Sequence, residues 1–218
     1  MYLSRLLLNP NSRQVQRETA DPYNLHRTIL KAFDTDRQSA NVLHRIETNG
    51  RSGQTILLVQ SDVKPNWQPL LGKSYLLPED PFTDLANPAV KEINLPLADG
   101  QLLRFRLVAN PTIKKVRRDK NGNRLNSNRV PLVHEAKQIE WLQKQAQANG
   151  FRILDIGISQ PEQQTSRKQG NGRSITIYTV TFNGRLQITD AAKFQTAVQT
   201  GIGPAKAFGC GLLSLAPG

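Results

Sequence analysis

The chain has 218 residues, of which 38% are hydrophobic and 21% charged, enough for a packed core in one large domain or two domains of about 100 residues each. Its 29 Lys and Arg residues exceed its 17 Asp and Glu residues, and the resulting net charge of +12 favours a polyanionic partner such as nucleic acid. No run approaches the roughly 18 apolar residues of a membrane-spanning helix, and the apolar start is too short for a signal peptide, so we expect a cytoplasmic protein with no membrane partner.

The first half of the chain reads as alternating strands and helices. It predicts a strand at residues 2–8, a helix at 22–33, strands at 42–48 and 55–61, a short turn of helix near 67–71, and a strand near 90–95. A proline-rich segment before the last of these strands predicts a loop.

The second half repeats this order of elements. Leu103, Phe105 and Leu107 alternate with arginines, as on a strand with one buried face. A helix is predicted at residues 135–148, strands at 151–158 and on both sides of an Asn183–Gly184 hairpin turn, a helix at 191–199, and a last strand at 211–216. Both halves therefore read strand, helix, strand, strand, helix, strand, the order of a ferredoxin-like unit. We expect an α+β protein with two tandem ferredoxin-like (βαββαβ) domains and antiparallel sheets, at residues 1–96 and 97–218.

The helix that begins at residue 22 carries a candidate site. Asp21 can cap it, and Pro22 suits its first position. At 100° per residue, its apolar side chains form one face, whereas Tyr23, His26, Arg27 and Lys31 fall on the other side, with His26 at the border.

This polar side suits metal-free cleavage of a phosphodiester. His26 can transfer a proton at neutral pH, a cation at Arg27 or Lys31 can hold the phosphate, and Tyr23 can position a hydrogen bond. The competing interpretation makes His26 a structural residue at the border of the helix, and the residues alone leave both open. His44 shares a strand face with Val42 and Ile46 and is interpreted as packing, and His134 as a solvated residue at the start of a helix.

Two basic segments favour contact with phosphates. Residues 114–129 carry seven cations against one acid without an amphipathic period, which predicts a mobile cationic loop. A second cluster precedes the strand that starts near residue 174. A plain solubilising surface is the alternative for each. The candidate phosphate-binding residues are Lys114, Lys115, Arg117, Arg118, Arg124, Arg129, Arg167 and Lys168, with Arg104 and Arg106 on the polar face of their strand.

The segment GIGPAKAFGCG, residues 201–211, fits neither nucleotide-binding glycine motif, because it lacks Gly-Lys-Ser/Thr and Lys206 replaces a required glycine. Two interpretations remain. Either Gly203 lets an RNA backbone approach while Lys206 reaches a phosphate, or the segment is only a tight connection.

Metal and disulfide chemistry is not expected. The single cysteine, Cys210, excludes an internal disulfide and a multi-cysteine zinc site. The segment HEAKQ at His134 begins like a zinc-protease helix, but Gln138 stands where the second histidine is required. We expect no metal and no cofactor.

Five segments together resemble the CasE family, the CRISPR RNA-processing endoribonucleases of type I-E systems. They are MYLSRLLLNP, PYNLHRTILKAF, LRFRLVANP, VPLVHEAKQIEWL and GIGPAKAFGCGLLSLAP, in the same order from one end of the chain to the other. The last is specific to the repeat-associated RNA-binding superfamily.

The resemblance implies two ferredoxin-like domains and metal-independent cleavage of the CRISPR repeat transcript at the base of a hairpin. It implies attack by a 2′-hydroxyl, which leaves a 2′,3′-cyclic phosphate and a 5′-hydroxyl, and retention of the product in a Cascade-type complex with other subunits. The essential histidine of the family falls on His26 and the tyrosine on Tyr23. Lys31 as a transition-state cation is a looser match.

Two alternatives to an endoribonuclease stay open. A non-catalytic RNA-binding subunit of a CRISPR ribonucleoprotein complex would need only the basic segments and the glycine-rich turn. A single-stranded DNA-binding protein is disfavoured, because aromatic residues make up only 6% of the chain and stacking platforms need exposed aromatics.

Overall fold

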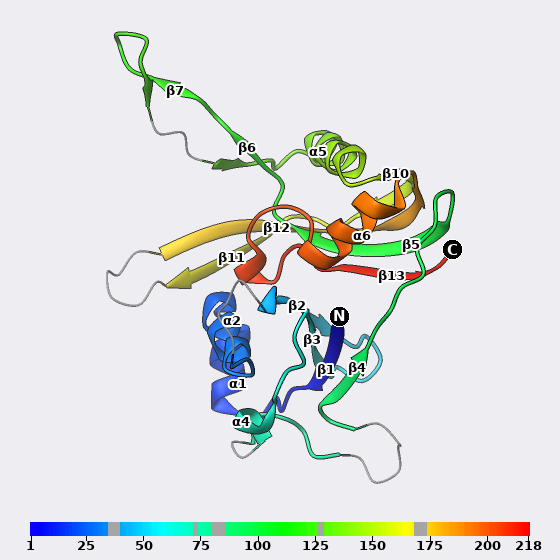
Figure 1. Ribbon diagram of the computed structural model, residues 1–218. Coiled ribbons are helices and arrows are strands. Elements are labelled where there is room, and N and C mark those ends of the chain that lie inside the picture. The colour runs from blue at the N-terminus through cyan, green and yellow to red at the C-terminus, as the bar shows by residue number, and fades with distance from the viewer. Residues whose placement is uncertain (35–39, 72–73, 80–85, 126–128, 168–173) are drawn as a thin grey trace.

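Two antiparallel sheets, one from each half of the chain, carry the fold of this computed structural model, which describes residues 1–34, 40–71, 74–79, 86–125, 129–167 and 174–218 (Figure 1). The first sheet has the strand order β2-β3-β1-β4. Helices α1 and α2 connect β1 to β2, and the single turn α4 stands between β3 and β4. The bounds are β1 (Tyr2–Leu7), α1 (Arg13–Thr19), α2 (Pro22–Leu30), β2 (Leu43–Thr48), β3 (Thr55–Ser61), α4 (Gln68–Leu71) and β4 (Ala89–Glu92).

The second sheet has the strand order β10-β12-β5-β13, and β11 pairs with the first part of β12. Helices α5 and α6 belong to this half, followed by the short 3₁₀ helix η1. The bounds are β5 (Leu102–Ala109), α5 (Glu135–Ala148), β10 (Phe151–Ile158), β11 (Glu162–Arg167), β12 (Ser174–Ile188), α6 (Ala191–Thr200), η1 (Lys206–Phe208) and β13 (Leu213–Pro217). The expectation of an α+β protein with two ferredoxin-like domains is confirmed.

Each sheet buries one face against its own helices. In the first half, the helix residues Leu25 and Ile29 pack with Leu6 and Leu57 of the strands. In the second half, the predicted alternation on β5 is confirmed, because Leu103, Phe105 and Leu107 are buried while the arginines between them are exposed. These strand residues pack with the two helices in a separate core, which includes Leu142 and Phe194.

We propose the domain boundary between residues 96 and 97, since the two cores divide near this point, although Leu95 already packs against the second core. Hydrogen bonds join the two halves. The Gln60 side chain donates to the carbonyl of Val198 at 2.8 Å, and the buried Arg45 donates to Ser214 Oγ at 2.8 Å. The outer face of the first sheet is therefore fixed to the second half.

The predicted hairpin turn at Asn183–Gly184 is wrong. Strand β12 runs straight through both residues and pairs with β5 and β10 on its two sides. A Cβ at Gly184 would lie 2.1 Å from the carbonyl oxygen of Asp155, next to the register shift in β10. Glycine is thus required here because the backbone of β10 comes close, and such a close approach is one reason for a glycine inside a strand. In place of the predicted hairpin, β11 pairs antiparallel with the first part of β12.

Two other parts of the chain differ from the sequence-based expectation. Residues 112–125 and 129–131 form a projecting arm rather than a loop, in which β6 (Thr112–Lys114) pairs with β9 (Arg129–Pro131) and β7 (Arg117–Arg118) with β8 (Arg124–Leu125) (Figure 1). Helix α1 was not predicted, because Val15 is its single buried residue and it has no apolar stripe. In the described part of the chain, no helix is long and apolar enough to cross a membrane.

Candidate functional site

Helix α2 begins as its sequence predicts. Asp21 is the N-cap, with its carboxylate accepting the Asn24 backbone N–H at 3.4 Å, and Pro22 occupies the first turn. Leu25 and Ile29 are buried in the first core. The regular helix ends at Leu30, so that Lys31 is its C-cap. The capped first turn holds Tyr23 and His26 at the contact between the two halves.

His26 lies inside the protein and not on a half-exposed border. Its residue is 3% exposed, and its ring stacks on that of His44 in β2, with centroids 5.4 Å apart and planes inclined by 19°. His44 is 1% exposed, as its interpretation as a packing residue predicts. Burial lowers the pKa of His44 to about 3, and the nearby His26 adds to this effect, so the His44 ring is neutral at physiological pH.

Tyr23 brings residues of the second half against α2. Its ring centroid lies 6.0 Å from that of Phe208 in η1, and its backbone N–H donates to Ser166 Oγ in β11 at 3.2 Å. A Cβ at Gly209 would lie 3.8 Å from His44 Nε2, so the glycine-rich segment also covers the second histidine. Helix α2, with Tyr23 and His26, is therefore packed against β2, β11 and η1.

A cavity of about 440 Å³ opens beside this assembly, between the two halves. His44 and Phe208 line it together with Arg106 of β5. Arg106 Nε lies 3.5 Å from the carboxylate of Glu47, whereas the Arg104 side chain donates to the carbonyl of Pro217. The structure thus places Arg106 in the cavity that His44 lines and directs Arg104 to the C-terminal strand.

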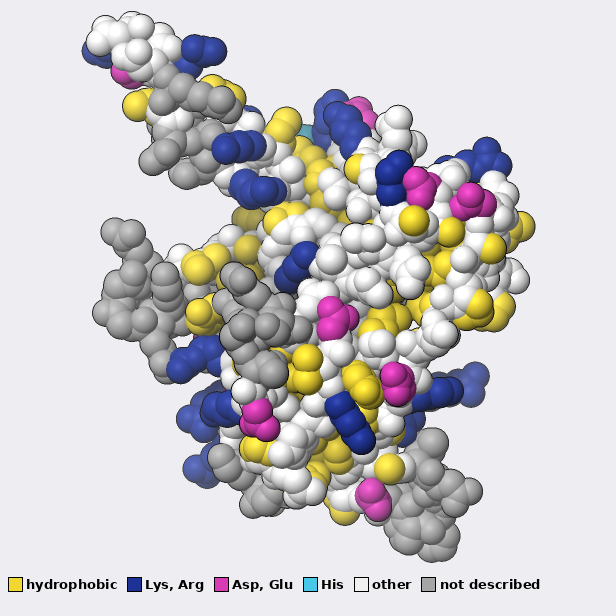
Figure 2. All heavy atoms as spheres, in the orientation of Figure 1, with side chains coloured by type: hydrophobic (Ala, Val, Ile, Leu, Met, Phe, Trp, Pro, Cys, Tyr) yellow, Lys and Arg dark blue, Asp and Glu magenta, His cyan; other side chains and the backbone are white. Residues whose placement is uncertain are grey.

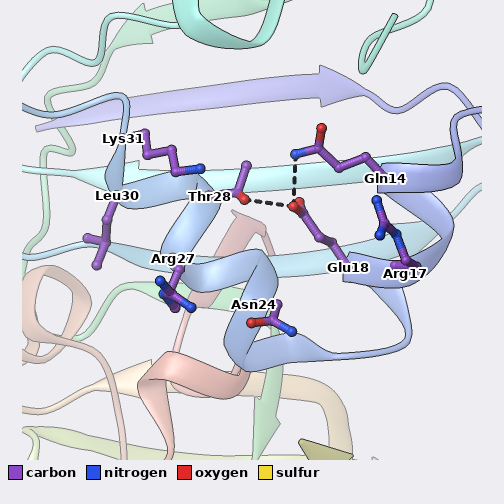
Figure 3. Close-up of a pocket in the computed structure, with 8 residues that line it drawn as sticks. All are labelled: Gln14, Arg17, Glu18, Asn24, Arg27, Thr28, Leu30 and Lys31. Carbon is purple, nitrogen blue, oxygen red and sulfur yellow. Dashed lines mark hydrogen bonds between the residues drawn. The ribbon is translucent and has the colours of Figure 1, made fainter. Parts of the chain in front are cut away.

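The cations of α2 face a different surface. Arg27 and Lys31 line a groove of about 590 Å³ between α1 and α2, whereas His26 packs inward against β2 (Figure 3). Glu18 of α1 lies in the floor of the groove, where its carboxylate accepts hydrogen bonds from Thr28 and Gln14 at 2.8 and 2.9 Å. The predicted trio of Tyr23, His26 and Lys31 is therefore distributed over two sides of one helix.

The glycine-rich segment has a packing explanation in this structure. Gly203 has φ +83°, and a Cβ there would lie 2.9 Å from Trp141 Cζ2. The Lys206 ammonium donates to the carbonyl of Thr200 at the end of α6, and partial burial lowers the pKa of Lys206. Cys210 is fully buried, which raises the pKa of its thiol to about 12 and keeps it protonated. Gly203 and Lys206 thus take part in the connection between α6 and β13, and their contacts with RNA stay a prediction.

The remaining predicted cations lie on the arm and on β11. The side chains of Lys114, Lys115, Arg118 and Arg129 are exposed, and Arg118 donates to the carbonyl of Gly122 at 2.9 Å. Figure 2 shows dark blue side chains on the arm and over α1 and α2, on the same side of the molecule. Arg117 lies in β7, Arg124 in β8 and Arg167 in β11. Lys168 lies outside the described residues.

Sequence reasoning missed three contributors to these surfaces. Phe208 lies in the glycine-rich segment, where only the glycines and Lys206 suggested a function. Ser166 lies in β11, a strand that no sequence pattern predicts. Arg17 lies in the unpredicted helix α1 and lines the groove with Arg27 and Lys31. Within the described part of the chain, no three His, Cys, Asp or Glu side chains gather so as to hold a metal ion.

Comparison with known proteins gives a consistent result along the whole chain. The protein family described as CRISPR associated protein matches residues 1–217. The CRISPR-associated endoribonuclease Cse3 of Thermus thermophilus is 34% identical over 230 residues, and the CRISPR system Cascade subunit CasE of Escherichia coli is 35% identical over 227 residues, each match covering 100% of both chains. A solved structure of CRISPR endoribonuclease Cse3 bound to 19 nt RNA has 32% identity and a TM-score of 0.82, again over 100% of both chains.

Proposed function

The chain belongs to the CasE-type family of CRISPR-associated proteins, and we propose on this basis that it is the endoribonuclease that processes CRISPR repeat transcripts and acts as a subunit of a Cascade complex. It cuts at the base of the repeat hairpin and stays bound to the product RNA. The observation that carries this proposal is the similarity, over the full length of both chains, to a named endoribonuclease. The proposed place of action is the cytoplasm.

We propose that the cleavage needs no metal ion. The 2′-hydroxyl of the RNA attacks the adjacent phosphate, the 5′-oxygen of the next nucleotide leaves, and the products are a 2′,3′-cyclic phosphate and a 5′-hydroxyl. His26 transfers a proton at one of these two oxygens, which an imidazole can do at neutral pH. Tyr23, one helical turn away, positions the phosphate by a hydrogen bond. DNA lacks the attacking hydroxyl and is therefore bound without being cut.

The burial of His26 adds a requirement to this mechanism. A ring in a residue that is 3% exposed meets a phosphate only if a neighbouring contact opens. The contact between Tyr23 and Phe208 is suited to this, because it joins α2 to the short η1 segment near the histidine pair. Catalytic hydrogen bonds often form only when the substrate is in place. RNA binding is thus proposed to part these two rings and expose His26.

The basic surfaces supply the affinity for RNA. The exposed cations of the arm can follow the phosphates of a hairpin, Arg106 lies in the cavity that His44 lines, and Arg27 and Lys31 lie in the groove between α1 and α2. Phosphate contacts position RNA without reading its sequence. Lys31 keeps a proposed role as a cation that stabilises the charged transition state, although it lies on the groove side of α2.

A non-catalytic RNA-binding subunit is the second candidate. The burial of His26, together with the position of Lys31 on the other side of α2, favours it. Cleavage of a labelled repeat hairpin in excess EDTA separates the two, with an RNA that carries a 2′-deoxy group at the cut as control. We expect cleavage in EDTA, a cyclic-phosphate end, and binding of the deoxy RNA without cleavage. Cleavage that stops in EDTA and returns with Mg²⁺ would contradict the metal-independent mechanism.

A further inference from the structure

The groove between α1 and α2 has the properties of an RNA-binding surface that extends beyond the site of proton transfer. It measures about 590 Å³ and carries Arg17 from α1 and Arg27 and Lys31 from α2 on its walls. Figure 3 shows Lys31 extending toward Thr28, with Glu18 beyond it and Arg17 on the opposite helix. Among the described residues that line the groove, the three cations outnumber the one carboxylate, that of Glu18.

The groove is rigid, because Glu18 ties its two walls together. One carboxylate oxygen accepts from Thr28 at 2.8 Å and Gln14 at 2.9 Å, and the other accepts from the phenol of Tyr75 at 2.6 Å. Tyr75 is fully buried beneath the helices. The carboxylate is thus occupied by hydrogen-bond donors of the protein, and the three cations lie on the two helices that it joins.

The composition of the groove selects phosphates over bases. The residues that line it in the described structure include no aromatic ring on which a base can stack. Arginine and lysine bind phosphate oxygens through charge-assisted hydrogen bonds. A single strand whose phosphates run between the two helices suits this surface.

We propose that the α1–α2 groove binds the single-stranded RNA that flanks the repeat hairpin, with Arg17 as a phosphate contact. This inference rests on the proposed function, in which cleavage at the base of a hairpin leaves duplex on one side of the cut and single strand on the other. His26 occupies the inner side of α2 and the groove its outer side, so a strand that leaves the histidine reaches the groove by crossing one helix. The arm and its cations remain available for the hairpin.

The test compares three RNAs that carry a 2′-deoxy group at the cut, namely the repeat hairpin alone and the hairpin with a short single-stranded 5′ or 3′ flank. We expect one flank to strengthen binding to the wild type. Arg17→Gln should bind this flanked RNA about fivefold more weakly than the wild type does, as for the loss of one exposed ionic contact. For the flanked RNA, the slope of log K against log salt concentration should be shallower in Arg17→Gln than in the wild type by about 0.7, the value for one phosphate of a single strand. Replacing the flank by another sequence should change nothing.

Lys91→Gln provides a matched control, because Lys91 is an exposed cation on β4, at the opposite side of the first half from α1 and α2 (Figure 1). It should bind all three RNAs as the wild type does. The inference is overturned if Arg17→Gln weakens the hairpin alone as much as the flanked RNA, or if neither flank adds affinity. Cleavage of the all-ribose repeat by Arg17→Gln, measured in parallel, reports separately on the proposed function.

Discussion

Replacing His44 by phenylalanine tests how the histidine pair is held. The change keeps an aromatic ring of similar size against His26, so the 5.4 Å stack has a substitute, but it removes two ring nitrogens. Neither nitrogen of His44 has a hydrogen-bond partner within the described structure. A buried polar group without a partner costs about 1–3 kcal/mol, so we expect His44→Phe to fold and to be at least as stable as the wild type at neutral pH.

The pH dependence of the same variant follows from the pKa of His44. Folding lowers this pKa from 6.5 to about 3, mainly by burial and to a lesser extent by repulsion from His26. Between these two values the unfolded chain binds a proton at His44 that the folded chain does not bind, so the free energy of unfolding decreases as the pH decreases. The slope approaches about 1.4 kcal/mol per pH unit, and the contribution of His44 between pH 7 and pH 5 is about 2 kcal/mol.

Urea denaturation of both proteins at pH 7 and pH 5 measures this difference. We expect the wild type to lose about 2 kcal/mol more than His44→Phe over this interval. His134→Gln is the control, because it removes an exposed histidine at the start of α5 and leaves the stacked pair intact. Equal losses of stability in the wild type and in His44→Phe would show that His44 is not held neutral by its surroundings, and the reasoning would fail.

Three further variants test other parts of the structure. Gly184→Ala places a Cβ 2.1 Å from a carbonyl oxygen of β10, so thermal denaturation should show a loss of about 3 kcal/mol or more; an unchanged Tm would contradict the close approach. Tyr75→Phe removes the 2.6 Å hydrogen bond to Glu18 and should cost about 1.5–3 kcal/mol in urea, and no loss would mean that this bond does not tie the helices. Exchange of both Lys114 and Lys115 for Gln should lower the salt dependence of hairpin binding by about 0.9 for each phosphate that the arm no longer neutralises, and an unchanged slope would place the hairpin elsewhere.

Those elements of both halves that bury one face, such as β5 and α2, were predictable because the buried face leaves a periodic pattern. The alternation on β5 and the capped start of α2 at Asp21 are local features, and the structure confirms both. The wrong or missing predictions concern features that leave no periodic pattern in the local sequence. Gly184 is required by the backbone of a neighbouring strand, and the two-residue strands β7 and β8 are too short to show any alternation.

The candidate site was predictable only in part. The sequence locates Tyr23, His26 and Lys31 on one helix, but the helical wheel does not say how deeply α2 packs. His26 is buried where His44 of β2 stacks on it, and the glycine-rich segment, distant in sequence, lies against His44. The stack with His44 and the ring contact between Tyr23 and Phe208 both join residues far apart in the chain, and a single sequence carries no sign of such contacts.

The central claim is that His26 transfers a proton during cleavage. Single-turnover cleavage of a labelled repeat hairpin tests it, with RNA binding measured in parallel for the wild type, His26→Ala, the bulkier His26→Gln and the control His134→Ala. We expect both His26 variants to bind RNA with nearly unchanged affinity and to cut about 10²–10⁴ times more slowly, while His134→Ala cuts like the wild type. Cleavage by the His26 variants at the wild-type rate, or binding without cleavage by the wild type itself, would contradict the claim.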